Sequence, residues 1–193
     1  EYFGIDDVLA MVIGGAVNAV SQLISGNVHN VGQFFAYFGV GAAAGEATLY
    51  AGPVVGGMLL GGGNAVLDGV FSGEGVSITK VVGGMAMGGA TSFLGGQIAG
   101  CVSRFVSPVL ENIASPVLKS SLLNSISGAV SGFALGTGFS LLHGCDLKTS
   151  LAEGGKGALI GFTTGTLAGI REGIKYGKDN KVNPWTGKEL PKP

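Results

Sequence analysis

Three chemically reactive side chains fall within four residues of this sequence, at His143, Cys145 and Asp146. An imidazole and a thiol can form a nucleophile–base pair, and all three residue types bind zinc. A nucleophile and its base must lie together in space, however, which adjacency in sequence does not supply, and the only further histidine for a metal site is His29. The favoured interpretation is a helix that ends near His143, a turn at Gly144, and a second helix capped by Asp146.

The other polar residues indicate no second candidate for an active site. Gly155-Lys156-Gly157 is similar to part of a phosphate-binding loop, but that loop needs Ser or Thr after its Lys. The net charge of −1 gives no electrostatic footprint for nucleic acid. We therefore expect no enzyme activity, cofactor, metal, nucleic-acid partner or small-molecule substrate. The isolated carboxylates that form no recognisable acid–base pair are Glu46, Asp68, Glu111 and Glu153.

The composition restricts the kinds of secondary structure that can position these residues. Glycine occurs 38 times in 193 residues, and only 12% of residues are charged, against averages of about 7% and about 25%. The mean hydropathy of +0.50 excludes a disordered chain. The two cysteines, Cys101 and Cys145, are too few for a disulfide framework. A single disulfide between them stays open, and the favoured interpretation is two buried small side chains.

Glycines recur every four residues along several segments, which places them on one face of a helix. A face without side chains lets a second backbone approach closely. Strands would also align these glycines, but the uncharged runs are too long for strands. Each interior glycine costs about 1 kcal/mol relative to alanine, so such helices need tight packing or lipid. The predicted helix-packing residues are Gly84, Gly88, Gly96, Gly100, Gly128, Gly132, Gly136, Gly157, Gly161, Gly165, Gly169, Gly173 and Gly177.

Three similar segments predict a repeated αα unit, in which a helix, a short turn and a second helix follow one another. Each segment closes on a glycine, at Gly26, Gly73 or Gly144. Ser-Pro pairs at 107–108 and 115–116 predict two helix starts in an insertion before the third unit. A capping box of Ser150 and Glu153 predicts the start of the last helix. The predicted helices cover residues 6–25, 30–50, 54–72, 78–103, 108–114, 116–143 and 150–177.

The predicted fold class is therefore all-α. It consists of glycine-zipper helical hairpins, as three repeated αα units with a short-helix insertion, and an extended C-terminal tail. We expect a helical domain over residues 1–177 and an exposed linker over 178–193, because the latter carries charges and three prolines, Pro184, Pro191 and Pro193.

Long uncharged stretches raise the question of a membrane. Residues 8–45, 47–67, 81–103 and 120–145 lack Asp, Glu, Lys and Arg, and each exceeds the roughly 20 residues that span a bilayer. Polar residues such as Asn18, Gln22 and Gln97 interrupt them, and most of their ends lack aromatic belts or basic clusters. Soluble packing and conditional membrane insertion both remain open, with soluble packing slightly favoured.

Both ends of the chain resemble a known family. The opening residues that carry the resemblance are Ile5-Asp6-Asp7-Val8 through Asn18. The closing ones are Gly161-Phe162 through Gly169-Ile170, Gly177-Lys178-Asp179-Asn180, and Asn183-Pro184-Trp185-Thr186-Gly187. With these residues the chain resembles the glycine-rich segment after the core of Rhs/YD-repeat polymorphic toxins of Bacteroidetes type. The resemblance implies a repeat shell that encloses a C-terminal toxin and a secretion system that delivers it to competing bacteria. It further implies that this chain is neither shell nor toxin, since only residues 188–193 follow the closing element.

Two functional hypotheses follow. The first is a non-catalytic helical connector or delivery segment of such a toxin, with its own repeat shell and toxin domain as partners. The second is a membrane-inserting or pore-forming effector whose partner is membrane lipid. Either hypothesis predicts a secreted or membrane-associated bacterial protein.

Overall fold

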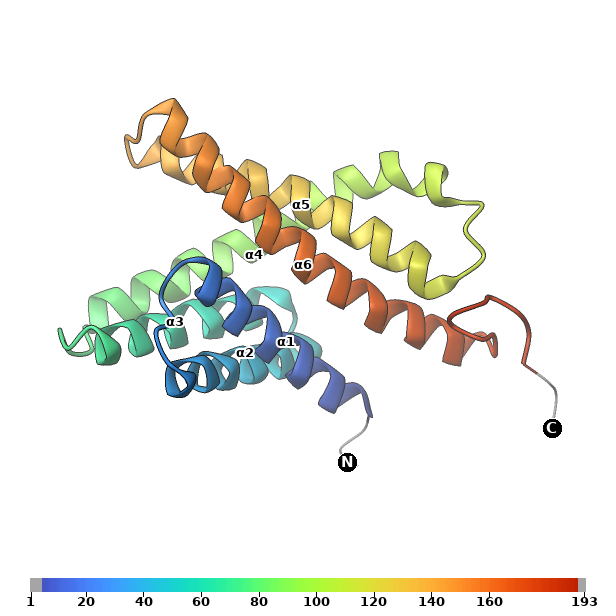
Figure 1. Cartoon of the computed structure of the whole chain (residues 1–193), viewed down its shortest axis with the longest axis horizontal. Coiled ribbons are helices and arrows are strands. Elements are labelled where there is room, and N and C mark those ends of the chain that lie inside the picture. The colour runs from blue at the N-terminus through green and yellow to red at the C-terminus, as the bar shows by residue number, and fades with distance from the viewer. Residues whose placement is uncertain (1–4, 191–193) are drawn as a thin grey trace. The chain divides into compact units, whose positions relative to one another are not determined.

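The computed structural model describes residues 5–190 (Figure 1). Its elements in chain order are α1 (Ile5–Ile24), α2 (Val31–Ala51), α3 (Pro53–Phe71), α4 (Ile78–Val106), the 3-10 helix η1 (Ser107–Leu110), α5 (Pro116–Leu142) and α6 (Leu147–Asp179). The prediction of an all-α fold is confirmed, because the described residues contain no strand longer than one isolated bridge, between Val182 and Glu189.

Short-range signals determine where the helices begin and turn. The Asn30 side chain accepts a hydrogen bond from Gln33 N at the start of α2, and the Ser115 hydroxyl accepts one from Leu118 N ahead of Pro116 in α5. Between paired helices the chain reverses at Gly26, Gly73 and Gly144, with φ of 80°, 74° and 80°. Glycine adopts this left-handed conformation without the steric cost that a Cβ atom brings.

Two predicted boundaries are wrong. The last helix begins at Leu147 rather than Ser150, because the Asp146 carboxylate accepts hydrogen bonds from Lys148 N and Thr149 N and so caps the helix one turn earlier. The helix predicted over 108–114 is a single 3-10 turn that starts at Ser107, with Val106 rather than Ser107 in the capping position. It directly continues α4, which leaves no extended residue for a Ser cap.

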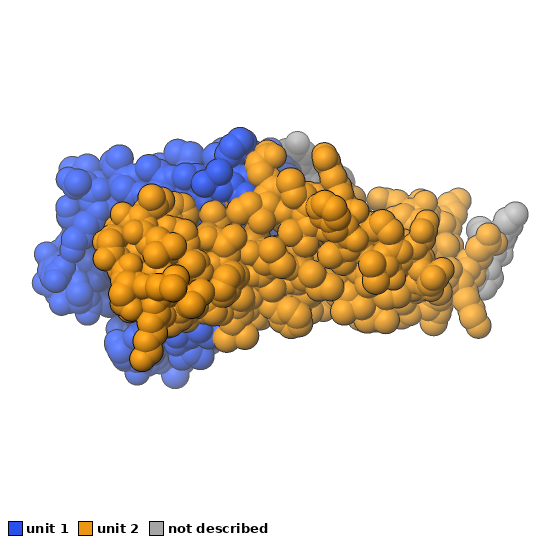
Figure 2. Space-filling view, turned by 90° about the horizontal axis from the view of Figure 1, so that it is seen from above, with its two compact units in different colours: residues 1–94 blue, residues 95–193 orange. Residues whose placement is uncertain are grey.

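The chain divides into two compact units within α4, residues 1–94 and residues 95–193 (Figure 2). In the first unit, α2 packs antiparallel to α1, and a Cβ atom on Gly14 would overlap the carbonyl oxygen of Gly41. The helix α3 packs antiparallel to the first part of α4 in the same way, through Gly61 and Gly84. Each pair is therefore held at a separation that only glycine permits.

In the second unit, α5 and α6 run antiparallel and side by side along their whole length (Figure 1). Contacts recur in steps of four residues, from Gly136 with Glu153, through Gly132 with Gly157, to Gly128 with Gly161. Because the steps are equal and opposite on the two helices, the i±4 rows remain in register along the pair.

The predicted extended tail is wrong for residues 180–190, which fold back on the hairpin. The Asn183 side chain accepts hydrogen bonds from Trp185 N and Thr186 N, and Leu190 N donates to Lys181 O. The turn is anchored to the start of α5, since Val117 N donates to Pro184 O over 3.0 Å. The backbone N–H groups of this turn therefore donate to the Asn183 side chain rather than to water. Composition alone assigned the same residues to an exposed linker. Residues 191–193 of that predicted linker lie outside the described residues.

Candidate functional site

Large apolar side chains lie mainly on the outside of both units. Among the described residues 33 large apolar side chains are exposed, whereas the buried apolar residues number seven, four of which are alanine. The buried polar residues include Asn18, Ser125, Ser127, Ser131 and Ser150. Soluble domains usually bury Leu, Ile, Val and Phe and expose polar groups. The described part of this chain has the opposite distribution along its helices.

Four segments are long and apolar enough to cross a membrane. They are Asp7–Ile24, Pro53–Phe71, Ile78–Leu110 and Pro116–Leu142, and between 0% and 28% of each is buried within the structure. The described structure therefore leaves most of these apolar faces exposed. Complete burial of a large apolar side chain is worth about 1.5–3 kcal/mol, and the exposed side chains, which keep 36% to 82% of their area accessible, gain only part of it.

Most of the predicted glycines of α5 and α6 lie between these two helices. Cβ atoms on Gly128, Gly132 and Gly136 would overlap backbone atoms of α6, and the same substitution in α6 would overlap α5. This α6 set comprises Gly157, Gly161, Gly165, Gly169 and Gly173, while Gly177 lies against Pro184 in the C-terminal turn. The contacted atoms are carbonyl groups and other main-chain atoms, which cannot move aside as a flexible side chain can.

The predicted glycines of α4 behave in two ways. Gly84 and Gly88 lie against Gly61 and Gly57 of α3, whereas Cβ atoms on Gly96 and Gly100 would meet no atom within 4 Å. The described chain therefore brings no neighbour to these two predicted helix-packing residues. Because α3 begins at Pro53 and runs antiparallel, it has no residues left to face α4 beyond about one turn after Gly88.

Several close contacts involve glycines outside the predicted set. Gly14, Gly41 and Gly45 join α1 to α2, and Gly57 and Gly61 join α3 to α4. All five belong to pairs spaced by four residues or face such a pair. The four-residue period of the sequence does identify the pair of Gly41 and Gly45, whereas Gly14 has no such partner, and the pair of Gly57 and Gly61 lies within a segment where glycine is abundant throughout.

An amide pair links three helices of the first unit. Asn18 Nδ2 donates to Asn64 Oδ1 over 2.8 Å, and Asn64 Nδ2 donates back to Asn18 Oδ1 over 2.9 Å. Asn18 Nδ2 also donates to the carbonyl oxygen of Tyr37 over 2.7 Å. The pair thereby connects α1, α2 and α3 at one level. Reciprocal Asn contacts of this kind specify register where apolar packing alone would not.

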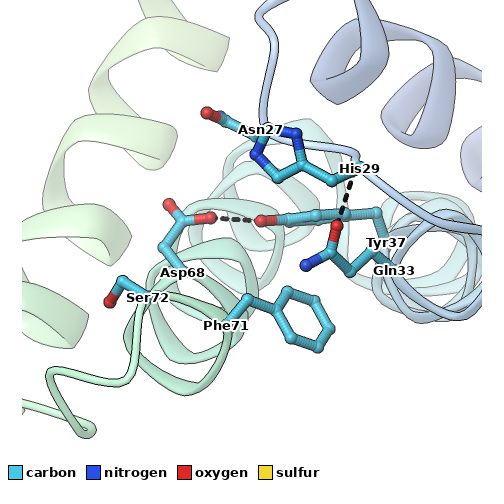
Figure 3. Close-up of a pocket in the computed structure, with 7 residues that line it drawn as sticks. All are labelled: Asn27, His29, Gln33, Tyr37, Asp68, Phe71 and Ser72. Carbon is cyan, nitrogen blue, oxygen red and sulfur yellow. Dashed lines mark hydrogen bonds between the residues drawn. The ribbon is translucent and has the colours of Figure 1, made fainter.

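A polar cavity of about 190 Å³ lies at one end of the first unit (Figure 3). Tyr37 is buried in α2, and its hydroxyl donates to Asp68 Oδ1 of α3 over 2.5 Å. The ring of His29 lies over this pair, and Gln33 accepts a hydrogen bond from His29 N. Burial, followed by the hydrogen bond and negative charge of Asp68, raises the pKa of the Tyr37 phenol above its usual value. The neutral phenol thus donates a hydrogen bond to Asp68, the single carboxylate of α3.

Hydroxyl groups make the corresponding polar contacts of the second unit. Ser125 Oγ lies 2.7 Å from Thr166 Oγ1 between α5 and α6, and Ser150 Oγ donates to Ser140 Oγ over 3.1 Å. Ser125 also donates back to its own helix at Ser121 O. These side chains are short enough to allow the close backbone approach, and their hydroxyl groups form hydrogen bonds with one another.

The reactive group at 143–146 forms a structural turn. His143 Nδ1 lies 2.7 Å from Phe139 O, and Asp146 caps α6. Hydrogen bonds from the Thr149 hydroxyl and backbone lower the pKa of the Asp146 carboxyl. Cys145 and Cys101 are exposed free thiols, so the expectation of buried cysteines is wrong. Cys101 lies in α4, and Cys145 lies in the turn between α5 and α6. Among the described residues no group of three metal-ligand side chains comes together.

The chain thus combines outward apolar faces with inward glycine, serine and amide contacts. Comparison with protein-family models, with curated proteins and with solved structures finds no match to it.

Proposed function

We propose that this chain is a non-catalytic, membrane-inserting delivery segment. Its glycine-lined faces hold helices together in three repeated αα units, and its apolar faces meet lipid. The observation that carries the proposal is the outward placement of large apolar side chains along four helices that are each long enough to cross a bilayer.

The physics of helix association in lipid supports this assignment. Lipid tails are as apolar as leucine, so helices there associate through close packing of small residues and interhelical hydrogen bonds. Both are present, in the glycine contacts of α5 with α6 and in the Asn18–Asn64 pair. In water the same helices would be weakened by the low helix propensity of glycine, and their apolar faces would be exposed to solvent.

The resemblance at the chain ends supplies a setting for the proposal. A glycine-rich segment between the repeat shell and toxin of a polymorphic toxin would need to carry its cargo past a target membrane. Helical hairpins that insert conditionally would serve that step, and the neighbouring shell would cover their apolar faces beforehand.

A second candidate is a connector that stays packed against the shell and toxin. It is favoured by α2 and α6, which are not among the four segments apolar enough to span. The helix α6 carries charged residues along both ends, including the ion pair of Lys156 with Glu153 at 2.7 Å. Under this alternative the apolar faces would be covered by protein rather than by lipid.

A matched pair of lysine substitutions separates the two. Val130→Lys places a charge in the middle of α5, and Val76→Lys places the same charge in the loop between α3 and α4; the two valines are 44% and 51% exposed. A lysine at a membrane midplane costs about 3 kcal/mol, whereas an exposed surface substitution changes stability by less than about 0.5 kcal/mol.

The measurement is co-flotation with liposomes and release of an entrapped dye. We expect the natural chain and Val76→Lys to float and release dye, and Val130→Lys to lose both by roughly a hundredfold. Equal behaviour of the two variants, or failure of the natural chain to associate with liposomes at all, would refute membrane insertion and leave the packed connector.

A further inference from the structure

The two ends of the α5–α6 hairpin differ in chemistry. We call residues 114–119 and 171–190 the hairpin base, and residues 141–151 the hairpin tip. The base carries Trp185 and Tyr176, which are 61% and 55% exposed. The exposed large side chains of the tip are instead aliphatic, namely Leu141, Leu142, Leu147 and Leu151.

Contacts between distant segments hold the base together. The carbonyl oxygen of Pro184 accepts hydrogen bonds from Val117 N over 3.0 Å and from Ser115 Oγ over 3.3 Å. Gly177 of α6 lies against Pro184, and Gly187 lies against the Ala114 carbonyl group. These contacts fix the turn at residues 180–187 against the start of α5 and the end of α6, and this turn contains Trp185. The course of the chain through this turn can be followed in Figure 1. The aromatic and basic residues of the base therefore occupy one end of the hairpin in a defined arrangement.

The base also carries an excess of positive charge. Its acidic residues are Glu172, Asp179 and Glu189, and Glu172 accepts a hydrogen bond from Asn124. Within residues 5–190 the ion pairs are Lys80 with Glu74 and Lys156 with Glu153, so the basic side chains of the base are unpaired there. These basic residues are Lys119, Arg171, Lys175, Lys178, Lys181 and Lys188.

The spacing of charges along the hairpin matches a bilayer. The helix α5 has 27 residues, or about 40 Å at 1.5 Å per residue, and a hydrocarbon core is about 30 Å thick. Lys148 in the tip and Arg171 in the base are 23 residues apart along α6, or about 35 Å. When the base lies in one headgroup layer, Lys148 therefore reaches the other, and Glu153 and Lys156 between them are held as an ion pair at 2.7 Å.

We propose that the hairpin base is an anchor for anionic phospholipid headgroups, which orients the inserted hairpin with its tip across the bilayer. The inference rests on the proposed membrane insertion. Tryptophan and tyrosine favour the headgroup layer, where an amphipathic ring has both an apolar and a wet side. Lysines beside that layer are attracted to anionic lipid, and the near-neutral tip of Asp146 and Lys148 has no such excess.

The sequence supplies two native probes for the test. Trp185 is the only tryptophan of the chain and reports on the base. Cys145 is exposed at the tip, and Cys101→Ser removes the other thiol. The full chain is mixed with vesicles of phosphatidylcholine, alone or with equal parts of phosphatidylglycerol. Brominated lipids then measure the depth of Trp185, and a membrane-impermeant maleimide added outside measures access to Cys145.

The anchor predicts shallow quenching of Trp185 and protection of Cys145 in the mixed vesicles. Neutralising Lys175 and Lys188 with Lys175→Gln and Lys188→Gln should weaken binding to mixed vesicles about fivefold for each lysine, with binding to phosphatidylcholine unchanged. Lys148→Gln at the tip is the matched control and should leave both affinities unchanged.

Each other result overturns a different statement. If Cys145 is protected while Trp185 stays in water and the base substitutions match Lys148→Gln, the anchor is refuted and membrane insertion survives. Deep quenching of Trp185 with a reactive Cys145 refutes the proposed orientation. If neither probe responds to any vesicle, membrane insertion itself is refuted, and the anchor with it.

Discussion

The α5–α6 hairpin and the α1–α2–α3 group hold their helices together by different means. In the hairpin, main chains touch at nearly every fourth residue, and hydroxyl pairs such as Ser125 with Thr166 fill the remaining polar contacts. In the α1–α2–α3 group, glycine contacts are fewer, and longer side chains bridge the helices through Asn18–Asn64 and Tyr37–Asp68. Neither region depends on a core of large apolar residues.

The difference shows two ways to join helices whose contact faces carry few large apolar side chains. Backbone approach is distributed over many weak contacts, so the hairpin is sensitive to volume added anywhere on its contact face. Side-chain bridges are few and directional, so the α1–α2–α3 group is sensitive to the loss of particular polar atoms. Substitutions that add volume or remove hydrogen bonds can therefore test the contrast directly.

The largest effect is expected from added volume in the hairpin. Gly161→Ala would place a methyl group against the carbonyl group of Gly128, and the helices would have to separate, at a cost of about 3 kcal/mol. Gly155→Ala in the same helix is the control, because its Cβ would meet no atom within 4 Å. It should stabilise α6 by up to about 1 kcal/mol. Denaturant unfolding followed by Trp185 fluorescence measures both, and equal effects would contradict backbone contact as the source of stability.

The next effect is expected from the amide pair of the α1–α2–α3 group. Asn64→Leu leaves the buried amide of Asn18 without its side-chain partner, which should cost about 2 kcal/mol. The double variant Asn18→Leu with Asn64→Leu should be less destabilised than the sum of the two single variants. Amide hydrogen exchange in α1 and α3 provides the free energies for this cycle. Strict additivity would show that the two side chains do not interact.

A smaller effect, with a pH dependence, is expected at Tyr37. Tyr37→Phe removes the hydrogen bond to Asp68 and should cost about 1.5 kcal/mol. The folded pKa of Tyr37 is raised above its unfolded value of 10.0, so folding favours the neutral phenol. The stability from this residue is complete below pH 10 and declines above it as the unfolded state ionises.

The measurement is unfolding of the α1–α2–α3 group between pH 8 and 11, a range chosen around the unfolded value of 10.0. Tyr37→Phe should flatten the alkaline loss of stability, whereas Tyr176→Phe, at a residue of the other unit that is 55% exposed, should leave it unchanged. An alkaline profile that is the same in the natural chain and in Tyr37→Phe would contradict the assignment.

The smallest effect is expected at the cap of α6. Asp146→Asn keeps an acceptor for Lys148 N and Thr149 N but removes the charge. Because the folded pKa of Asp146 is lowered by its hydrogen bonds with Thr149, its contribution is present above the unfolded value of 3.8 and is lost as the pH falls through the folded pKa. In Asp146→Asn the first turn of α6 should no longer fray with acid, as amide exchange at Thr149 and Ser150 would show.

Much of the helical framework was predictable from local signals. Ser115-Pro116 placed the start of α5, and Gly26, Gly73 and Gly144 marked the reversals, because capping and left-handed glycine act over a few residues. The predicted helix start at Ser150 is wrong because two residues that can cap a helix, Asp146 and Ser150, lie about one turn apart. The C-terminal turn failed because its anchor, the start of α5, is distant in sequence.

The candidate site was predictable in kind but not in detail. A four-residue period indicates that glycines share a helix face, and it cannot show whether a second helix reaches that face. Gly88 and Gly96 belong to the same four-residue series of α4. A Cβ atom on Gly88 would overlap α3, however, whereas one on Gly96 would have no neighbour within 4 Å. Likewise nothing in the sequence around Asn18 identifies Asn64 as its partner, and nothing around Tyr37 identifies Asp68. The two residues of these pairs are 46 and 31 positions apart.

The amino-acid sequence by itself determined that the chain is helical, rich in glycine and poor in charge, since period, caps and composition are local properties. Only the tertiary structure decided which helices pair, which side chains bridge them, and that the large apolar residues face outward. The physical reason is that antiparallel register and helix ends, such as the start of α3 at Pro53, determine where one backbone can reach another.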